Sequence, residues 1–103
     1  MSDGSLYNVQ ALLVGQTIKF RPHGNSMVPR IYSGQLVTVA PVIEDTPIVP
    51  GDVVLCKVNG NQMLHKVTAI GSDGRYQIGN NHGHINGWCT RKNVFGVLIA
   101  VEN

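Results

Sequence analysis

The chain has 103 residues, of which 43% are hydrophobic and 14% are charged, and its formal net charge is +2 at pH 7. This length is typical of one domain over residues 1–103, with a modest core that needs neither disulfides nor a structural metal. The Lys and Arg residues are scattered along the chain, so the sequence carries no strong nucleic-acid signal.

The N-terminal residues and the cysteines predict where the protein resides. Residues 1–5 are polar and lack a basic region, and the apolar run at residues 11–14 is too short to span a bilayer. Two cysteines, Cys56 and Cys89, are too few for a secreted disulfide scaffold. We therefore expect a soluble, cytoplasmic protein with free thiols and no membrane anchor.

The first half of the chain predicts one short helix and two strands. Apolar residues in 5–14 have roughly helical spacing, and Gly15 is placed to end a helix there. Residues 17–21 alternate between apolar and polar side chains, and residues 36–40 are rich in β-branched side chains. Between them lies the turn-forming segment 24–29, which contains Gly, Asn and Pro.

The second half predicts strands joined by tight turns. Asn59-Gly60-Asn61 is a strong hairpin signal between strands at residues 53–58 and 62–70. Further strands are expected at residues 75–78 and 94–101, whereas residues 79–87 are interpreted as a polar loop. The predicted fold is mainly β, a small coiled-sheet or barrel-like domain of short antiparallel strands with at most one short N-terminal helix.

The first candidate for a catalytic residue lies in the segment 24–29, where Ser26 directly follows Gly24-Asn25. A tight turn of this kind can hold a serine hydroxyl away from the backbone, but Gly, Asn and Ser are also ordinary loop residues. A serine nucleophile requires a base that removes its proton. His65 and Lys66 are the candidate bases, and on one strand they face opposite sides of the sheet. The alternation of the strand does not decide between them.

The order of several short motifs resembles the catalytic domain shared by type I signal peptidases and LexA-like self-cleaving repressors. The resemblance runs from about residue 15 to residue 101. The matching motifs are Gly24-Asn25-Ser26-Met27-Val28-Pro29, Gly51-Asp52-Val53-Val54, Leu64-His65-Lys66-Val67, Gly79-Asn80-Asn81-His82 and Val94-Phe95-Gly96-Val97.

This resemblance implies the LexA/signal-peptidase type of fold and assigns roles to particular residues. Ser26 stands at the nucleophile position, and His65 stands at the base position, as in the histidine-type signal peptidases of archaea and the endoplasmic reticulum. Lys66 is the alternative base. Asn80 occupies the position of an Asp that supports the base in the histidine-type family members, which makes Asn80 the candidate support here.

The same turn offers donors for an oxyanion hole. Gly24 and Asn25 are placed to aim the Ser26 N–H at a carbonyl oxygen, and the Asn25 side chain is a further donor. Asp52 is interpreted as a cap of the turn that precedes the next strand rather than as a catalytic acid. The His and Cys residues lack the spacing of a zinc site, so we expect no metal and no cofactor.

These residues lead to two hypotheses of function. The first is a serine endopeptidase, a hydrolase whose Ser26–His65 dyad cleaves an extended peptide or protein substrate that pairs with a strand edge. The alternative is a catalytically weak or inactive member of the same fold that binds a peptide or a partner protein as a regulatory module. A homo-oligomer, or a partner that completes the site, is compatible with both hypotheses.

Overall fold

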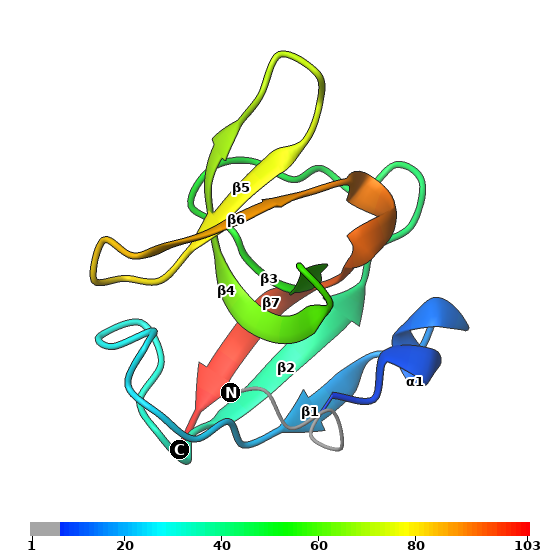
Figure 1. Cartoon of the computed structure of the whole chain (residues 1–103). Helices are drawn as coiled ribbons and strands as arrows, with labels where there is room; N and C mark the ends of the chain where they lie inside the picture. The colour runs from blue at the N-terminus through cyan, green and yellow to red at the C-terminus, as the bar shows by residue number, and fades with distance from the viewer. Residues whose placement is uncertain (1–6) are drawn as a thin grey trace.

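One antiparallel sheet of seven strands dominates the computed structural model, which describes residues 7–103 (Figure 1). The strand order across the sheet is β1-β2-β7-β3-β4-β5-β6. The predicted mainly β class, with one short α-helix near the N-terminus, is confirmed for the described residues, and a 3-10 helix, η2 (Arg91–Asn93), precedes the last strand. The strands are β1 (Ile18–Phe20), β2 (Leu36–Pro41), β3 (Val53–Val58), β4 (Asn61–Ile70), β5 (Tyr76–Gly79), β6 (Ile85–Cys89) and β7 (Val94–Glu102).

The helix α1 (Val9–Leu13) is shorter than the predicted helix over residues 5–14, whose first two positions lie outside the described residues. It begins after Asn8, whose side-chain oxygen accepts a hydrogen bond from the Ala11 N–H at 3.2 Å. This is an ordinary N-cap interaction. Gly15 follows with a φ of 87°, a conformation that favours glycine and ends the helix.

The prediction of a polar loop over residues 79–87 was wrong at both ends, because Gly79 is the last residue of β5 and residues 85–87 belong to the next strand. Residues 85–89 form β6, which pairs with β5 at the edge of the sheet. The segment combines polar and glycine residues with little apolar alternation, so its β conformation comes from pairing with β5 rather than from its own pattern. This strand carries a residue of the candidate site.

The strand β3 is buried on both faces and joins two apolar clusters. Leu55 belongs to the cluster under α1 and β2, while Val54 and Cys56 belong to the cluster under β5 and β6. Because side chains alternate across a strand, β3 contributes to both clusters at once. The two apolar clusters, which lie on opposite faces of β3, are therefore joined by this one strand.

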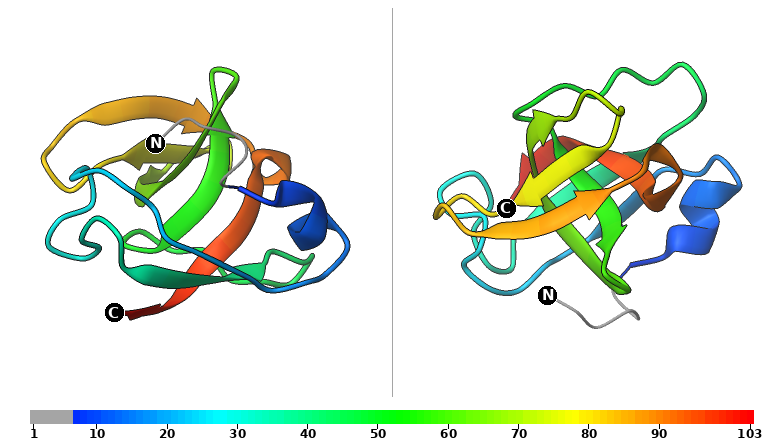
Figure 2. Two further views of the ribbon diagram at one scale, coloured as in Figure 1. Left: turned by 90° about the horizontal axis from the view of Figure 1, so that it is seen from below. Right: turned by 45° about the horizontal axis from the view of Figure 1, so that its top comes forward.

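The sheet coils strongly, and the long strand β4 provides the curve (Figures 1 and 2). As a result β6 comes back into contact with β3, although β4 and β5 lie between them in the sheet order. The buried thiols of Cys56 on β3 and Cys89 on β6 are hydrogen-bonded to each other and are not in a disulfide. This bond and burial raise the pKa of Cys56, and the same bond lowers the pKa of Cys89.

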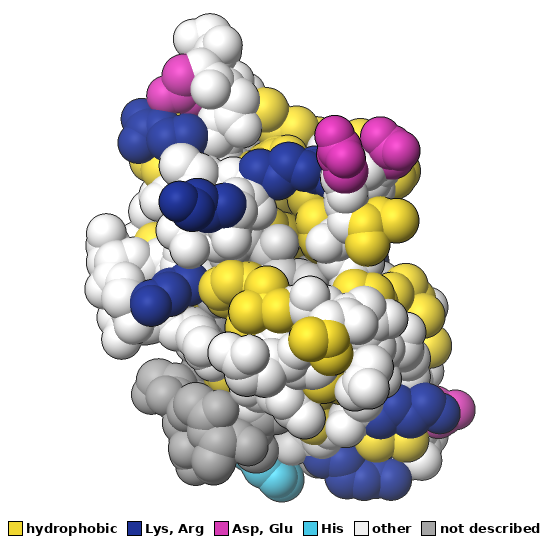
Figure 3. All heavy atoms as spheres, turned by 90° about the vertical axis from the view of Figure 1, so that its right-hand side faces the viewer, with side chains coloured by type: hydrophobic (Ala, Val, Ile, Leu, Met, Phe, Trp, Pro, Cys, Tyr) yellow, Lys and Arg dark blue, Asp and Glu magenta, His cyan; other side chains and the backbone are white. Residues whose placement is uncertain are grey.

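The face that carries α1 and the loop after β2 exposes hydrophobic side chains between charged ones (Figure 3). An open groove of about 410 Å³ lies there, and Leu13, Ile43 and Phe95 are among the residues that line it. Within residues 7–103, no helix has the length and apolar character needed to cross a membrane.

Candidate active site

The serine turn lies between β1 and β2 and begins at Gly24, whose φ of 122° is a conformation that glycine tolerates and other residues avoid. Met27 and Ile31 are buried in the cluster under α1, and they anchor the turn on the sheet. The Ile31 N–H donates to the Met27 carbonyl at 2.9 Å. Ser26 is therefore held half-buried at the edge of a packed turn rather than on a free loop.

The structure brings Ser26 and His65 together, although 39 positions separate them in the chain. The distance between Ser26 Oγ and His65 Nε2 is 3.1 Å, which is within hydrogen-bond range. His65 lies in the curved part of β4, and its side chain is 8% exposed. This geometry is what a serine nucleophile and its general base require.

A third side chain, Asn86, completes a chain of hydrogen bonds through the histidine. Its Oδ1 lies 2.7 Å from His65 Nδ1, on the side of the ring away from Ser26. A carboxamide oxygen only accepts hydrogen bonds, so Nδ1 carries the proton and Nε2 presents its lone pair to the Ser26 hydroxyl. The histidine is thus held in the tautomer that can accept the serine proton.

A β-bulge directs Asn86 at the histidine. Ile78 pairs with Gly87 and Gly79 pairs with Ile85, which leaves Asn86 as the extra residue of β6. Bulges of this kind redirect a side chain and often occur beside active sites. Asn86 is not recognisable as a site residue from the sequence alone, because its position depends on a strand and a register shift that the local pattern does not show.

Asn80, the residue expected to support the base, has a different set of partners. Its side-chain oxygen accepts hydrogen bonds from the N–H groups of His82 and His84, at 2.8 and 3.0 Å. Its own N–H donates to the His84 carbonyl at 2.9 Å. Asn80 therefore shapes the loop between β5 and β6, and the side chain that accepts a hydrogen bond from His65 is Asn86.

Lys66, the alternative base, lies on the other face of β4 from His65. The neighbours of His65 on its own face, Met63 and Val67, are in the cluster under β5 and β6, whereas Leu64 on the Lys66 face is in the cluster under α1. Among residues 7–103, no hydrogen bond joins Lys66 to Ser26, whose hydroxyl is paired with His65.

Burial sets the protonation state of His65. Removal from solvent lowers the pKa of His65 from its usual value of 6.5, and the hydrogen bond that His65 donates to Asn86 partly offsets this effect. The imidazole is consequently neutral at pH 7 and is able to accept a proton.

The three residues expected to form the oxyanion hole have different surroundings. The Gly24 N–H donates to Ser33 Oγ at 3.1 Å, so the turn itself already uses this donor. Within the described part of the chain, neither the Ser26 N–H nor the Asn25 side chain makes a hydrogen bond. The Ser26 amide and the Asn25 carboxamide are therefore both open donors among the described residues, and the Ser26 amide belongs to the same residue as the hydroxyl.

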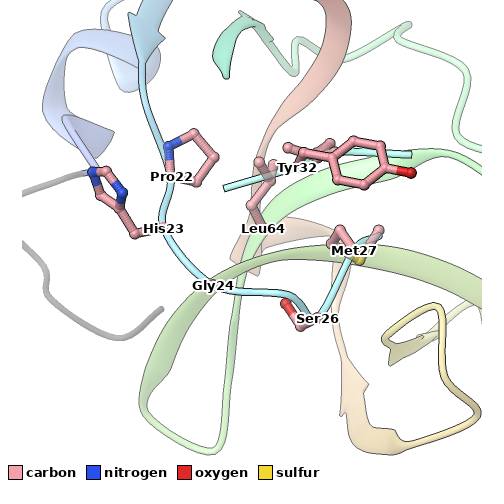
Figure 4. Close-up of a pocket in the computed structure, with 8 residues that line it drawn as sticks. Pro22, His23, Gly24, Ser26, Met27, Tyr32 and Leu64 are labelled. Carbon is pink, nitrogen blue, oxygen red and sulfur yellow. The ribbon is translucent and has the colours of Figure 1, made fainter. Parts of the chain in front are cut away.

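A small apolar pocket of about 20 Å³ adjoins Ser26. Ser26 lies at its rim, with Met27 and Tyr32 on one side, Pro22 and His23 on the other, and Leu64 between them (Figure 4). A volume of this size holds about one water molecule or methyl group.

Two other sequence interpretations concern Asp52 and metal binding. Asp52 Oδ2 accepts a hydrogen bond from the Val49 N–H at 2.9 Å, which confirms that Asp52 caps the turn before β3. Among residues 7–103, no group of three or more His, Cys, Asp or Glu side chains is arranged to hold a metal ion.

Two comparisons with known proteins find no relative of this chain. No protein-family model matches the chain, and a search of curated proteins finds no significant match. The arrangement of the site itself therefore carries the functional argument.

Proposed function

We propose that the protein is a serine endopeptidase of the LexA/signal-peptidase type, in which Ser26 is the nucleophile and His65 is the general base. The observation that carries the proposal is the continuous hydrogen-bond chain from Ser26 Oγ through His65 to Asn86 Oδ1. Asn also serves as the third member of Cys-His-Asn triads, where it orients the imidazole without supplying a charge.

The reaction follows from the positions of these atoms. Ser26 Oγ attacks a peptide carbonyl while His65 Nε2 takes the hydroxyl proton, and the imidazolium then donates that proton to the leaving amine. Water, activated by the same nitrogen, hydrolyses the resulting ester and regenerates Ser26. The Ser26 N–H is the donor for the oxygen that becomes negative in the tetrahedral intermediate.

The pocket beside Ser26 indicates the kind of substrate. Its volume of about 20 Å³ suits a side chain no larger than that of alanine or serine next to the scissile bond. The substrate is an extended peptide or protein segment whose backbone pairs with a strand edge near the pocket.

A fluorophosphonate probe followed by intact-mass spectrometry tests this function. We expect one covalent adduct on wild-type protein, no adduct on Ser26→Ala and adduct formation slowed by at least about 100-fold in His65→Ala. Peptides with Ala at the residue before the scissile bond should be cleaved faster than matched peptides with Leu there.

The alternative is a binding module that keeps the fold without efficient catalysis. The observation that favours it is the uncharged Asn86, which stabilises an imidazolium less than a carboxylate does. A wild-type protein that forms no adduct and cleaves no peptide, but binds peptides equally well with Ser26→Ala, would reject the peptidase in favour of this module.

A further inference from the structure

The loop between β5 and β6 holds three consecutive carbonyl groups of the serine turn. The Asn81 N–H donates to the Ser26 carbonyl at 3.0 Å, and Asn81 Nδ2 donates to the Met27 carbonyl at 3.1 Å. His82 Nε2 lies 2.8 Å from the Asn25 carbonyl oxygen. A carbonyl oxygen only accepts, so His82 Nε2 carries a proton in this contact.

The bond from His82 has a particular consequence for catalysis. The Asn25 carbonyl and the Ser26 N–H belong to one planar trans peptide group, in which C=O and N–H point in opposite directions. Fixing the carbonyl therefore fixes the direction of the Ser26 N–H. The same carbonyl also accepts from the Val28 N–H, but at the longer distance of 3.3 Å.

The exposed position of His82 argues against a role in the core. Its side chain lies at the surface, and its backbone is held separately by the bond from its N–H to Asn80 Oδ1. Replacement of the side chain therefore leaves the loop anchored through Asn80 and Asn81. The only hydrogen bond that the described residues offer to the imidazole is the one at the Asn25 carbonyl.

We infer that His82 is a positioning residue, which orients the Ser26 amide as an oxyanion donor by holding the Asn25 carbonyl. This inference rests on the proposed peptidase function and adds a residue that does not touch the reacting atoms. An amide that rotates away removes a donor that is needed only when charge develops on the substrate oxygen, so the loss affects kcat more than KM.

Kinetics of three variants provide the first test. In His82→Leu we expect kcat to fall by at least about 10-fold with KM within about threefold of wild type. His82→Gln places an amide donor at a similar reach and should restore most of kcat. His84→Leu is the matched control, because His84 lies in the same loop and makes its hydrogen bonds there through its backbone. The values of kcat are compared on the plateau of the pH–rate profile, where the Coulombic effect of His84 on the pKa of His65 does not change kcat.

Nuclear magnetic resonance provides a second readout that does not depend on activity. The Asn25 carbonyl-carbon and Ser26 amide resonances should shift in His82→Leu, return toward wild type in His82→Gln and stay unchanged in His84→Leu. Wild-type positions of both resonances in His82→Leu would overturn the inference, and so would an unchanged kcat in an active protein. A wild-type protein without hydrolytic activity would instead overturn the proposed function, while the resonances still decide whether His82 holds the peptide group.

Discussion

At the scale of single residues, the histidine between Ser26 and Asn86 depends on two different partners. Ser26 Oγ at 3.1 Å is the proposed nucleophile, while Asn86 Oδ1 at 2.7 Å fixes the ring and its tautomer. A substitution of Ser26 removes the proposed nucleophile, whereas a substitution of Asn86 removes only the group that orients the His65 ring. The two substitutions should therefore affect the kinetics differently.

Asn86→Ala should lower kcat by roughly 100-fold, because the His65 ring loses the acceptor that fixes its tautomer and position. Asn86→Asp should retain more activity than Asn86→Ala and should move the acid limb of the pH–rate profile upward, because a carboxylate stabilises the imidazolium. Peptide hydrolysis measured from pH 5 to 9 checks both expectations. Asn61→Asp, at an exposed position at the start of β4, is the control. An equal kcat in Asn86→Ala and wild type would remove Asn86 from the site.

The pH dependence of activity follows from the lowered pKa of His65. The neutral imidazole is the proposed active form, so the acid limb of kcat/KM should have its midpoint below pH 6.5. A midpoint of the acid limb at or above 6.5 in wild-type protein would contradict this expectation.

The lowered pKa of His65 also predicts that the stability of the fold changes with pH. The unfolded chain binds more protons than the folded chain between the usual pKa of 6.5 and the lower folded pKa. The contribution of His65 to the free energy of unfolding is therefore fully present above pH 6.5, and it is lost as pH falls from 6.5 through that window. Urea titrations of wild type and His65→Gln check this: the variant should lose stability less steeply on acidification.

At the scale of elements, the loop between β5 and β6 connects the edge of the sheet to the serine turn. Gly79 closes this loop tightly, because a Cβ at Gly79 would lie 2.6 Å from the His84 carbonyl oxygen. The loop then reaches the serine turn through Asn81 and His82. Loop and turn form one structural unit around the nucleophile.

Gly79→Ala should move this loop, destabilise the fold by about 1–3 kcal/mol and lower kcat. Gly96→Ala is the matched control: its Cβ would clash with Val39 Cγ1 in the sheet, at a position outside the site. Both variants should unfold at lower urea concentration, but only Gly79→Ala should show reduced kcat per folded molecule. A kcat reduced equally in both variants would mean that the loop has no specific role.

At the scale of the whole molecule, the two apolar clusters meet at β3. Leu55 is completely buried in one cluster, and its neighbours Val54 and Cys56 are completely buried in the other. Loss of packing on either face of this strand should therefore destabilise both clusters.

Leu55→Ala should reduce the free energy of unfolding by about 2–5 kcal/mol, through lost burial and the cavity that remains. Ile99→Ala, at an exposed position of β7, should change the free energy of unfolding by less than about 0.5 kcal/mol. Trp88 fluorescence reports β6, and far-ultraviolet circular dichroism reports the whole sheet. Different midpoints from these two probes would show that the clusters unfold separately.

The local pattern of the sequence determined most of the strands and the position of the serine turn. The hairpin at Asn59-Gly60-Asn61 and the apolar run of β3 have strong local preferences, so they are visible without tertiary information. Ser26 stands out as a serine in a tight turn, but the strand pattern leaves both His65 and Lys66 as candidate bases, and only the resemblance in motif order favours His65.

The completion of the site depends on tertiary contacts between distant segments of the chain. Asn86 faces His65 because β6 pairs with β5 through a one-residue bulge, and no local preference of residues 85–89 specifies that register. His82 meets the Asn25 carbonyl because the chain brings positions 57 residues apart together. The sequence determined which side chains have the right chemistry, and the coiling of the sheet decided which asparagine contacts the histidine.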